Sequence, residues 1–248
     1  MPTCAMPRMR PEAVALADGT SAAATLIVPD SGIGPGILLL QEIFGVNDFV
    51  LGKAEDFAAL GYSVLCPDLY ARLAPGLALA HDDAGLQQSL ELVQRYFGEL
   101  DEATRISDLV AALAHLCSLP ECGGRVAVVG YCLGGTLAYA LAGSAELDAC
   151  VAYYGSGIAD MLTSAPLVSC PLLLHYGGSD SYLPPEHAFA AVRAYAGQQN
   201  ASVLIQPGAG HAFENLLAPA FANPAAAARS WPVTVAFLAG ALGPGTPS

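Results

Sequence analysis

The chain has 248 residues, of which 54% are hydrophobic and 12% are charged. This composition excludes an intrinsically disordered chain, because disorder requires low hydrophobicity, and the length is ordinary for a single α/β domain. Nine basic residues stand against 22 acidic ones, giving a net charge of −13. Such a balance argues against nucleic acid or an anionic membrane as a partner, because those surfaces are bound by clustered Lys and Arg.

The seven cysteines are odd in number and none belongs to a C-x-x-C pair, so we expect free thiols in a reducing compartment rather than a disulfide framework. The first residues, MPTCAMPRMRPEA, lack the apolar segment of a secretory signal. We therefore expect a cytoplasmic protein. Nothing in the sequence marks an obligate interface, so a monomer is the default expectation.

The predicted elements begin with two strands joined by a hairpin turn at Asp18-Gly19. Strands are predicted at 12–16, 22–28, 36–41, 62–66, 125–130, 149–153, 171–176 and 202–206. Helices are predicted at 48–60 (capped by Asp48), 82–97, 101–119 (separated from the previous one by Gly98), 132–142, 185–195 and 224–238, with a loose tail from about residue 240. Strands that alternate with helices predict a mostly parallel central sheet with helices on both faces, in one domain over residues 1–248.

One uncharged run, residues 126–145, is long enough to span a membrane. Glycines interrupt it where its character changes from strand-like to helix-like, so we predict a buried strand, a glycine turn and a buried helix instead. The turn reads Gly130-Tyr131-Cys132-Leu133-Gly134, which is the G-x-S-x-G nucleophile elbow with Cys in place of Ser. The alternative is a tight packing turn with an inert Cys, whereas a dinucleotide fingerprint is disfavoured because the second glycine of G-x-G-x-x-G is missing.

A thiol nucleophile needs a base, and the base needs a carboxylate that orients it. Asp180 follows the strand PLLLHY, and His211 follows the strand SVLIQ within a glycine-rich loop. The order Cys132, Asp180, His211 is that of an α/β-hydrolase, and all three follow strand ends at the same predicted edge of the sheet. Taken singly, Asp180 and His211 are also ordinary loop residues.

Glu42 follows another strand end, and we expect it near Cys132. The backbone N–H groups of Ile43 and Leu133 are the predicted oxyanion hole. His175 is expected to face the packing inside its strand, and the remaining histidines are expected at the surface or at helix ends. These are His81, His115 and His187. No ligand spacing indicates a metal site, and no cofactor is expected.

The chain resembles the dienelactone hydrolase (carboxymethylenebutenolidase) family of α/β-hydrolases. The matching segments are QEIFGVN (41–47), GYSVLCPDLYAR with APG (61–76), VGYCLGG (129–135), YYG (153–155), GGSD (177–180) and GHAF (210–213). The resemblance implies that Cys132 is the nucleophile, His211 its base and Asp180 the orienter of the base. It further implies that Glu42 contacts the resting thiol until substrate displaces it, and it matches Ile43 and Leu133 as oxyanion donors.

Substrate recognition matches this family in part. Family members hold a substrate carboxylate with two arginines, and Arg72 matches the first. At the second position Asn215 stands in place of Arg, with the acidic Glu214 beside it. Asn lacks the charge of Arg and its bidentate geometry.

The sequence therefore predicts a hydrolase that opens esters or lactones, with the dienelactone reaction as its named activity. The alternatives are a carboxylesterase or thioesterase for small neutral acyl substrates, a binding protein whose chemistry has lapsed, and a redox-sensing thiol protein. Filled triad positions argue against lapsed chemistry, and Glu42 argues against a sensor because a nearby carboxylate opposes formation of the thiolate.

Overall fold

The structure is a computed structural model that describes residues 8–164 and 168–243. Its centre is an eight-stranded sheet with the order β1-β2-β4-β3-β5-β6-β7-β8. The strands are β1 Arg8–Ala15, β2 Ser21–Val28, β3 Gly34–Leu40, β4 Ser63–Pro67, β5 Cys122–Tyr131, β6 Ala149–Tyr153, β7 Leu172–Gly177 and β8 Ala201–Gln206. β1 and β2 form the predicted hairpin, and β2 pairs antiparallel with β4. The other pairs are parallel, as predicted.

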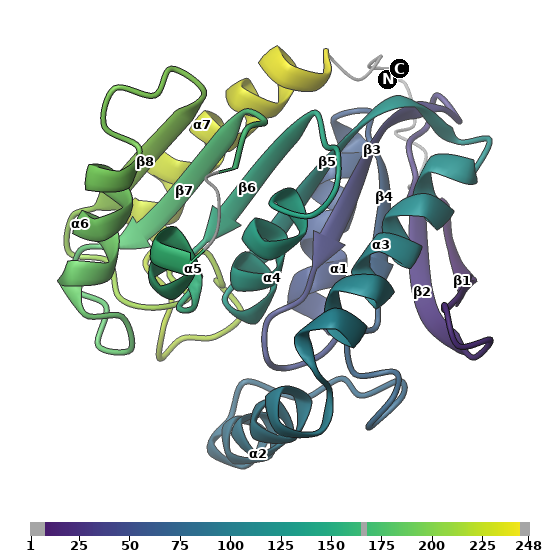
Figure 1. The fold of residues 1–248 in the computed structure, drawn as a ribbon, viewed down its shortest axis with the longest axis horizontal. Helices are drawn as coiled ribbons and strands as arrows, with labels where there is room; N and C mark the ends of the chain where they lie inside the picture. The colour runs from purple at the N-terminus through teal and green to yellow at the C-terminus, as the bar shows by residue number, and fades with distance from the viewer. Residues whose placement is uncertain (1–7, 165–167, 244–248) are drawn as a thin grey trace, which may run out of the picture.

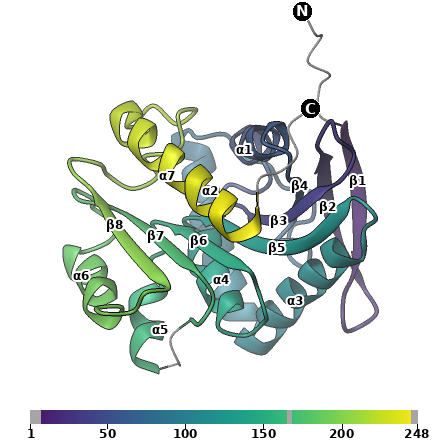
Figure 2. The same cartoon turned by 90° about the horizontal axis from the view of Figure 1, so that it is seen from above.

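The helices are α1 Asp48–Ala59, α2 Asp83–Glu99, α3 Glu102–Ser118, α4 Leu133–Ala142, α5 Ile158–Ser164, α6 Pro185–Ala194 and α7 Pro224–Leu242. α1 and α7 cover one face of the sheet, and α3 to α6 cover the other (Figure 2). α2 stands apart, beyond the carboxyl ends of the parallel strands (Figure 1). This placement brings α2 to the edge where the sequence predicts the site.

Several local predictions need correction. Asn47, not Asp48, caps α1 through its side chain, and Gly98 lies inside α2 rather than between two helices. The short helix α5 was not predicted. The predicted tail begins too early, because α7 continues to Leu242 and buries that side chain; residues 244–248 lie outside the described part of the chain, as do residues 1–7, which hold most of the segment examined for a signal.

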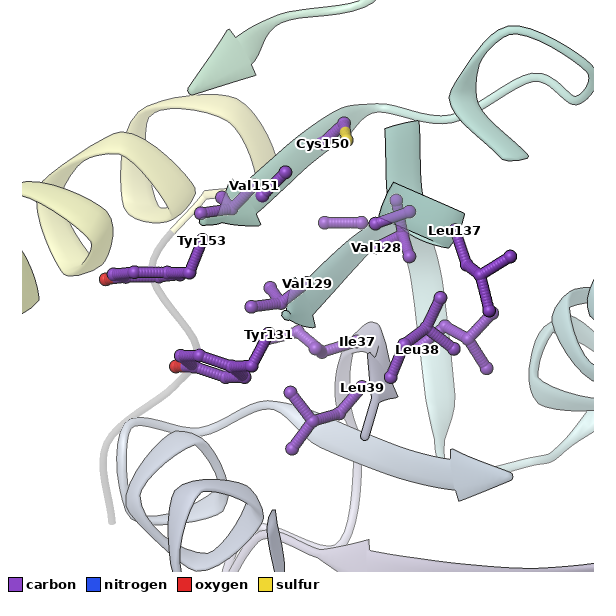
Figure 3. Packing of buried hydrophobic residues seen from close by; sticks show 14 of the residues in the cluster. Ile37, Leu38, Leu39, Val128, Val129, Tyr131, Leu137, Cys150, Val151 and Tyr153 are labelled. Carbon is purple, nitrogen blue, oxygen red and sulfur yellow. The ribbon is translucent and has the colours of Figure 1, made fainter. Parts of the chain in front are cut away.

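The core is built on the inner strands, whose side chains are buried on both faces, as expected for parallel strands covered by helices. Side chains alternate across the sheet, so that Leu38 lies near Leu137 of α4 while Tyr131 and Tyr153 lie on the opposite side (Figure 3). Tyr131 and Tyr153 stack with centroids 4.7 Å apart, and His175 stacks on Tyr153 at 4.4 Å. Burial lowers the pKa of His175 to about 3. The expectation that His175 faces the packing is confirmed.

The uncharged run 126–145 forms the end of β5, the elbow and α4, as predicted. Among the described residues, α7 is the helix that is long and apolar enough to cross a membrane. It packs on the sheet instead, where the Thr234 hydroxyl bonds to the hydroxyl of Tyr153 at 2.6 Å and to Nε2 of His175 at 3.1 Å.

Candidate active site

The turn between β5 and α4 has the geometry of a nucleophile elbow. Cys132 adopts φ 55° and ψ −113°, a backbone conformation that is uncommon for a residue with a side chain. The positions on either side of it require glycine, because backbone atoms lie where a side chain would begin. A Cβ on Gly130 would lie 2.0 Å from the carbonyl oxygen of Gly134, and one on Gly134 would lie 2.3 Å from that of Leu40. Cys132 also caps α4, so its thiol lies at the helix end whose free N–H groups favour negative charge.

The three residues of the predicted triad meet at this elbow. Nε2 of His211 lies 3.1 Å from Sγ of Cys132, and Nδ1 of His211 lies 2.8 Å from Oδ2 of Asp180. The other oxygen of Asp180 accepts the backbone N–H groups of Tyr182 and Leu183, at 2.8 and 3.0 Å. The carboxylate is therefore fixed by the turn after β7, and it in turn fixes the imidazole ring.

His211 is electrostatically unusual. Its burial alone would lower the pKa, but the adjacent Cys132 and the hydrogen bond that the ring donates to Asp180 outweigh that effect and raise the pKa of His211 to about 10. A ring with this pKa is protonated at neutral pH, so both of its nitrogens donate, Nδ1 to Asp180 and Nε2 to Sγ of Cys132.

Two backbone N–H groups next to Cys132 are free. Neither Ile43 nor Leu133 donates its N–H to an acceptor within residues 8–164 and 168–243. The Ile43 peptide is held in place because its carbonyl accepts the Tyr70 hydroxyl at 3.1 Å. The α4 end is tied to the same loop by the N–H of Gly134, which donates to the carbonyl of Gln41 at 3.0 Å. The two loops that carry the predicted oxyanion donors are thus joined.

Glu42 lies in the site, but it does not make the predicted contact with the thiol. Its side chain is 2% exposed. Its Oε1 accepts the Tyr154 hydroxyl at 3.2 Å, and its Oε2 accepts the Asn215 amide at 2.7 Å. Both oxygens of Glu42 are therefore engaged by other donors, and Sγ of Cys132 contacts His211 instead.

Glu42, Ile43, Cys132 and His211 line one pocket, a cavity of about 250 Å³. Its polar groups come from Glu42, His81, Cys132, His211 and Asn215, together with the hydroxyls of Ser156 and Tyr182. The remaining wall is apolar. It is formed by Ile43, Phe44, Leu86, Leu90, Val93, Ala212, Ala218 and Phe221. No Lys or Arg from the described part of the chain lines this pocket.

The structure does not bring Arg72 to the site, so the prediction that it binds substrate is wrong. Its guanidinium forms a bidentate pair with Asp108, at 2.6 and 2.8 Å, and also bonds to Asp18 at 2.5 Å. Arg72 borders a separate small hollow near β1 and α3. With three bonds to two carboxylates, the side chain has a structural role at the hairpin.

Glu214, the acidic residue beside Asn215, does not line the pocket. Its side chain is 1% exposed and points away from the pocket toward α1 and α7, where it pairs with Lys53 at 3.0 Å and bonds to the hydroxyl of Ser230. Asn215 does line the pocket, as predicted, but its amide is used by Glu42 and His81. Contact between Asn215 and a substrate stays a prediction.

Two residues of the site were not identified from the sequence. His81 was expected at the surface or at a helix end; it does lie directly before the N-cap of α2, but its side chain is 9% exposed and lines the pocket. It precedes α2 rather than following a strand, so strand-end reasoning gave no signal for it. Tyr154 follows β6 with φ 41° and bonds to Glu42; its place directly after a strand was an available signal. Among the described residues, no group of three His, Cys, Asp or Glu side chains is arranged to hold a metal ion.

The sheet, the elbow and the side chains above it define an α/β-hydrolase. The model of the dienelactone hydrolase family matches residues 22–242. The chain is 35% identical to a carboxymethylenebutenolidase from Pseudomonas putida, over 85% of this chain and 88% of that protein. It is 33% identical to carboxymethylenebutenolidase 1 from Cupriavidus pinatubonensis, over 78% and 81% of the two chains.

Solved structures agree with this assignment. A dienelactone hydrolase-like promiscuous phosphotriesterase from metagenomic libraries matches with a TM-score of 0.78 and 27% identity, over 95% of this chain and 99% of that one. A dienelactone hydrolase from Anabaena variabilis shares the fold, with a TM-score of 0.70 and 19% identity over 96% and 100% of the two chains. The chain belongs to the dienelactone hydrolase family and is a hydrolase.

Proposed function

We propose that the chain hydrolyses the ester or lactone bonds of small neutral substrates through a Cys132–His211–Asp180 triad. The observation that carries this proposal is the continuous contact from Sγ of Cys132 through His211 to Asp180, at 3.1 and 2.8 Å. This series of contacts lies at the wall of a pocket to which no Lys or Arg of the described residues contributes. A nucleophile, a base and an orienting carboxylate within hydrogen-bond reach are what covalent acyl transfer requires.

In the proposed reaction the Cys132 thiolate attacks the carbonyl carbon, and the N–H groups of Ile43 and Leu133 hold the oxyanion. Collapse of this intermediate breaks the C–O bond, and the departing oxygen takes its proton from the His211 imidazolium. The thioester that remains is attacked by water. His211 accepts one proton of that water, and the second tetrahedral intermediate then expels the thiolate and releases the acid.

The walls of the pocket support a neutral substrate with an apolar group. Leu86, Leu90 and Val93 follow the i, i+4, i+7 spacing of one helix face and present an apolar stripe of α2 to the cavity. A substrate carboxylate would find Glu42 there and no Lys or Arg from the described part of the chain, since Arg72 is committed to Asp108 and Asp18. Like charges in a buried site repel, so the pocket disfavours anions.

The test compares turnover of a neutral nitrophenyl acetate by the wild-type protein and by Cys132→Ala. We expect turnover that depends on Cys132, with a covalent acetyl adduct on that residue detected by mass spectrometry after rapid acid quenching. Leu217→Ala is a matched control, because this residue is exposed and does not line the pocket. Retained activity in Cys132→Ala would refute the nucleophile assignment. Binding of the ester without turnover by the wild type would favour a lapsed enzyme.

The second candidate is the dienelactone reaction itself, in which the carboxylate-bearing lactone is opened by water to maleylacetate. The names of the relatives from Pseudomonas putida and Cupriavidus pinatubonensis favour it. Assaying the same protein on this lactone and on the neutral ester separates the two. A higher kcat/KM for the lactone would mean that the carboxylate is accommodated without an arginine in the pocket.

A further inference from the structure

Glu42 carries a carboxylate inside the pocket that also holds the thiol of Cys132. Its side chain is 2% exposed, and it relies on two hydrogen bonds, from the hydroxyl of Tyr154 and from the amide of Asn215. Leaving a buried carboxylate oxygen without a donor is costly. If one of these donors is lost, the carboxylate will turn to the next available donor, and the S–H of Cys132 faces the same cavity.

The amide of Asn215 has a fixed orientation. Its Oδ1 accepts the backbone N–H of Leu217 at 3.1 Å, so its NH₂ group faces the pocket. That NH₂ group carries two hydrogens. One points to Glu42 at 2.7 Å, and the other points to Nε2 of His81 at 2.9 Å. Asn215 therefore bridges His81 and Glu42.

The role of His81 follows from its neighbours. Nε2 also lies 3.3 Å from the amide nitrogen of Asn47. That amide is fixed too, because its oxygen caps α1 at the N–H of Val50 and its nitrogen donates to the carbonyl of Leu79. The third neighbour of Nε2 is Oε2 of Glu42, at 3.8 Å. With NH₂ groups at 2.9 and 3.3 Å, Nε2 of His81 is placed to accept from them.

We infer that His81 is a positioning residue that acts through Asn215 to hold Glu42 away from Cys132. By accepting one amide hydrogen, His81 keeps the other aimed at the carboxylate, which leaves the thiol to His211. Without this acceptor the amide is free to turn, and Glu42 competes for the thiol and favours its protonated, unreactive form. This inference rests on the proposed function, in which Cys132 is the nucleophile.

The test measures the rate at which iodoacetamide alkylates Cys132 at one fixed neutral pH, followed by mass spectrometry of the peptide that contains this residue. We expect His81→Phe to slow alkylation about tenfold or more, the scale of one hydrogen bond to a charged group. His81→Gln places an acceptor oxygen near the position of Nε2, and we expect it to retain nearly the wild-type rate. His115→Phe removes a partly buried histidine that contacts Glu12, away from the pocket, and is the matched control.

The decisive variant combines His81→Phe with Glu42→Gln. If Glu42 inhibits the thiol when His81 is absent, the double variant regains the alkylation rate of Glu42→Gln alone. A double variant that stays slow overturns the inference, as does a single variant that alkylates at the wild-type rate. If His81→Phe fails to fold, as judged by circular dichroism, Asn215→Leu takes its place, because it removes the donor to Glu42 directly and the same rescue by Glu42→Gln is required.

Alkylation needs no substrate, so the outcome of this test can be separated from the outcome of the test of the proposed function. Loss of turnover in Cys132→Ala together with unchanged alkylation in His81→Phe removes the inference and leaves the function. Turnover that survives Cys132→Ala removes the function, whatever the alkylation rates are.

Discussion

Lys53 and the buried Glu214 form an ion pair, with Nζ 3.0 Å from Oε2, that ties the loop of His211 to the helix that follows the Glu42 loop. Lys53 lies on α1, and its ammonium also lies 4.2 Å above the ring of Trp231 on α7. Glu214 comes three residues after His211 and bonds to Ser230 on α7. Two helices on one face of the sheet thus anchor the loop that carries the predicted base.

Lys53→Met is expected to destabilise the fold by about 3–5 kcal/mol, because it leaves the carboxylate of Glu214 buried without a partner charge. The free energy of unfolding in urea, measured at neutral pH, checks this. Lys53→Met combined with Glu214→Gln removes both charges and should recover much of the loss. Lys53→Arg keeps the charge and is the control. A single variant that costs under about 1 kcal/mol would mean that the pair behaves as an exposed one.

Asp180→Asn is expected to lower kcat for a neutral ester about 100-fold or more, because general acid–base catalysis depends on the orientation and charge state of the base. It also changes the pH profile. The hydrogen bond that His211 donates to Asp180 helps to raise the pKa of His211 to about 10. The wild-type kcat/KM should therefore fall as the pH rises through about 10, where the imidazolium that protonates the leaving group is lost.

Removing the carboxylate lowers the pKa of His211, so the alkaline limb of Asp180→Asn should move to lower pH. Asp30→Asn, at an exposed turn residue, controls for the change in net charge. An alkaline limb that stays in place in Asp180→Asn would show that Asp180 does not set the charge state of His211.

The sequence was sufficient to predict those parts of the site whose structure is determined by local geometry. The glycines of the elbow are required by backbone contacts at Gly130 and Gly134, and such constraints are visible in a short motif. Asp180 and His211 were found because parallel strands end at one edge of the sheet. These predictions needed only the order of elements and the residue after each strand.

The failures share a different cause, which is that tertiary contacts decide where a long side chain points. Arg72 follows a strand, but it is taken up by Asp108 on α3 and Asp18 in the hairpin turn. Glu214 adjoins a pocket residue, yet it turns to the opposite side and meets Lys53. His81 lies in the loop directly before α2, and α2 lies beyond the strand ends. No spacing within the sequence encodes these pairings.

Arg72→Leu is accordingly expected to leave KM and kcat unchanged within about twofold for neutral and carboxylate-bearing substrates, since the side chain borders a different hollow. Its loss should cost about 1 kcal/mol of stability, a small value because the pair with Asp108 is partly exposed. Thermal unfolding and steady-state kinetics on both substrates measure this. A rise in KM restricted to the carboxylate-bearing lactone would restore Arg72 as a substrate contact.

Leu90 offers a way to change the charge preference of the pocket. It lines the cavity from α2 and is 47% exposed, so a longer side chain has room to extend toward the substrate. We expect Leu90→Arg to raise kcat/KM for a carboxylate-bearing lactone relative to a neutral ester by about tenfold, the scale of one partly desolvated ion pair.

Gln94→Arg is the matched control for Leu90→Arg, because it places the same charge on the same helix at an exposed residue outside the cavity. It reports the effect of net charge and of long-range attraction, both of which weaken as salt is added. The preference created by Leu90→Arg should exceed that of Gln94→Arg and should persist at high salt, since it depends on contact inside the pocket. Equal effects of the two variants would mean that α2 does not form the wall against which the substrate lies.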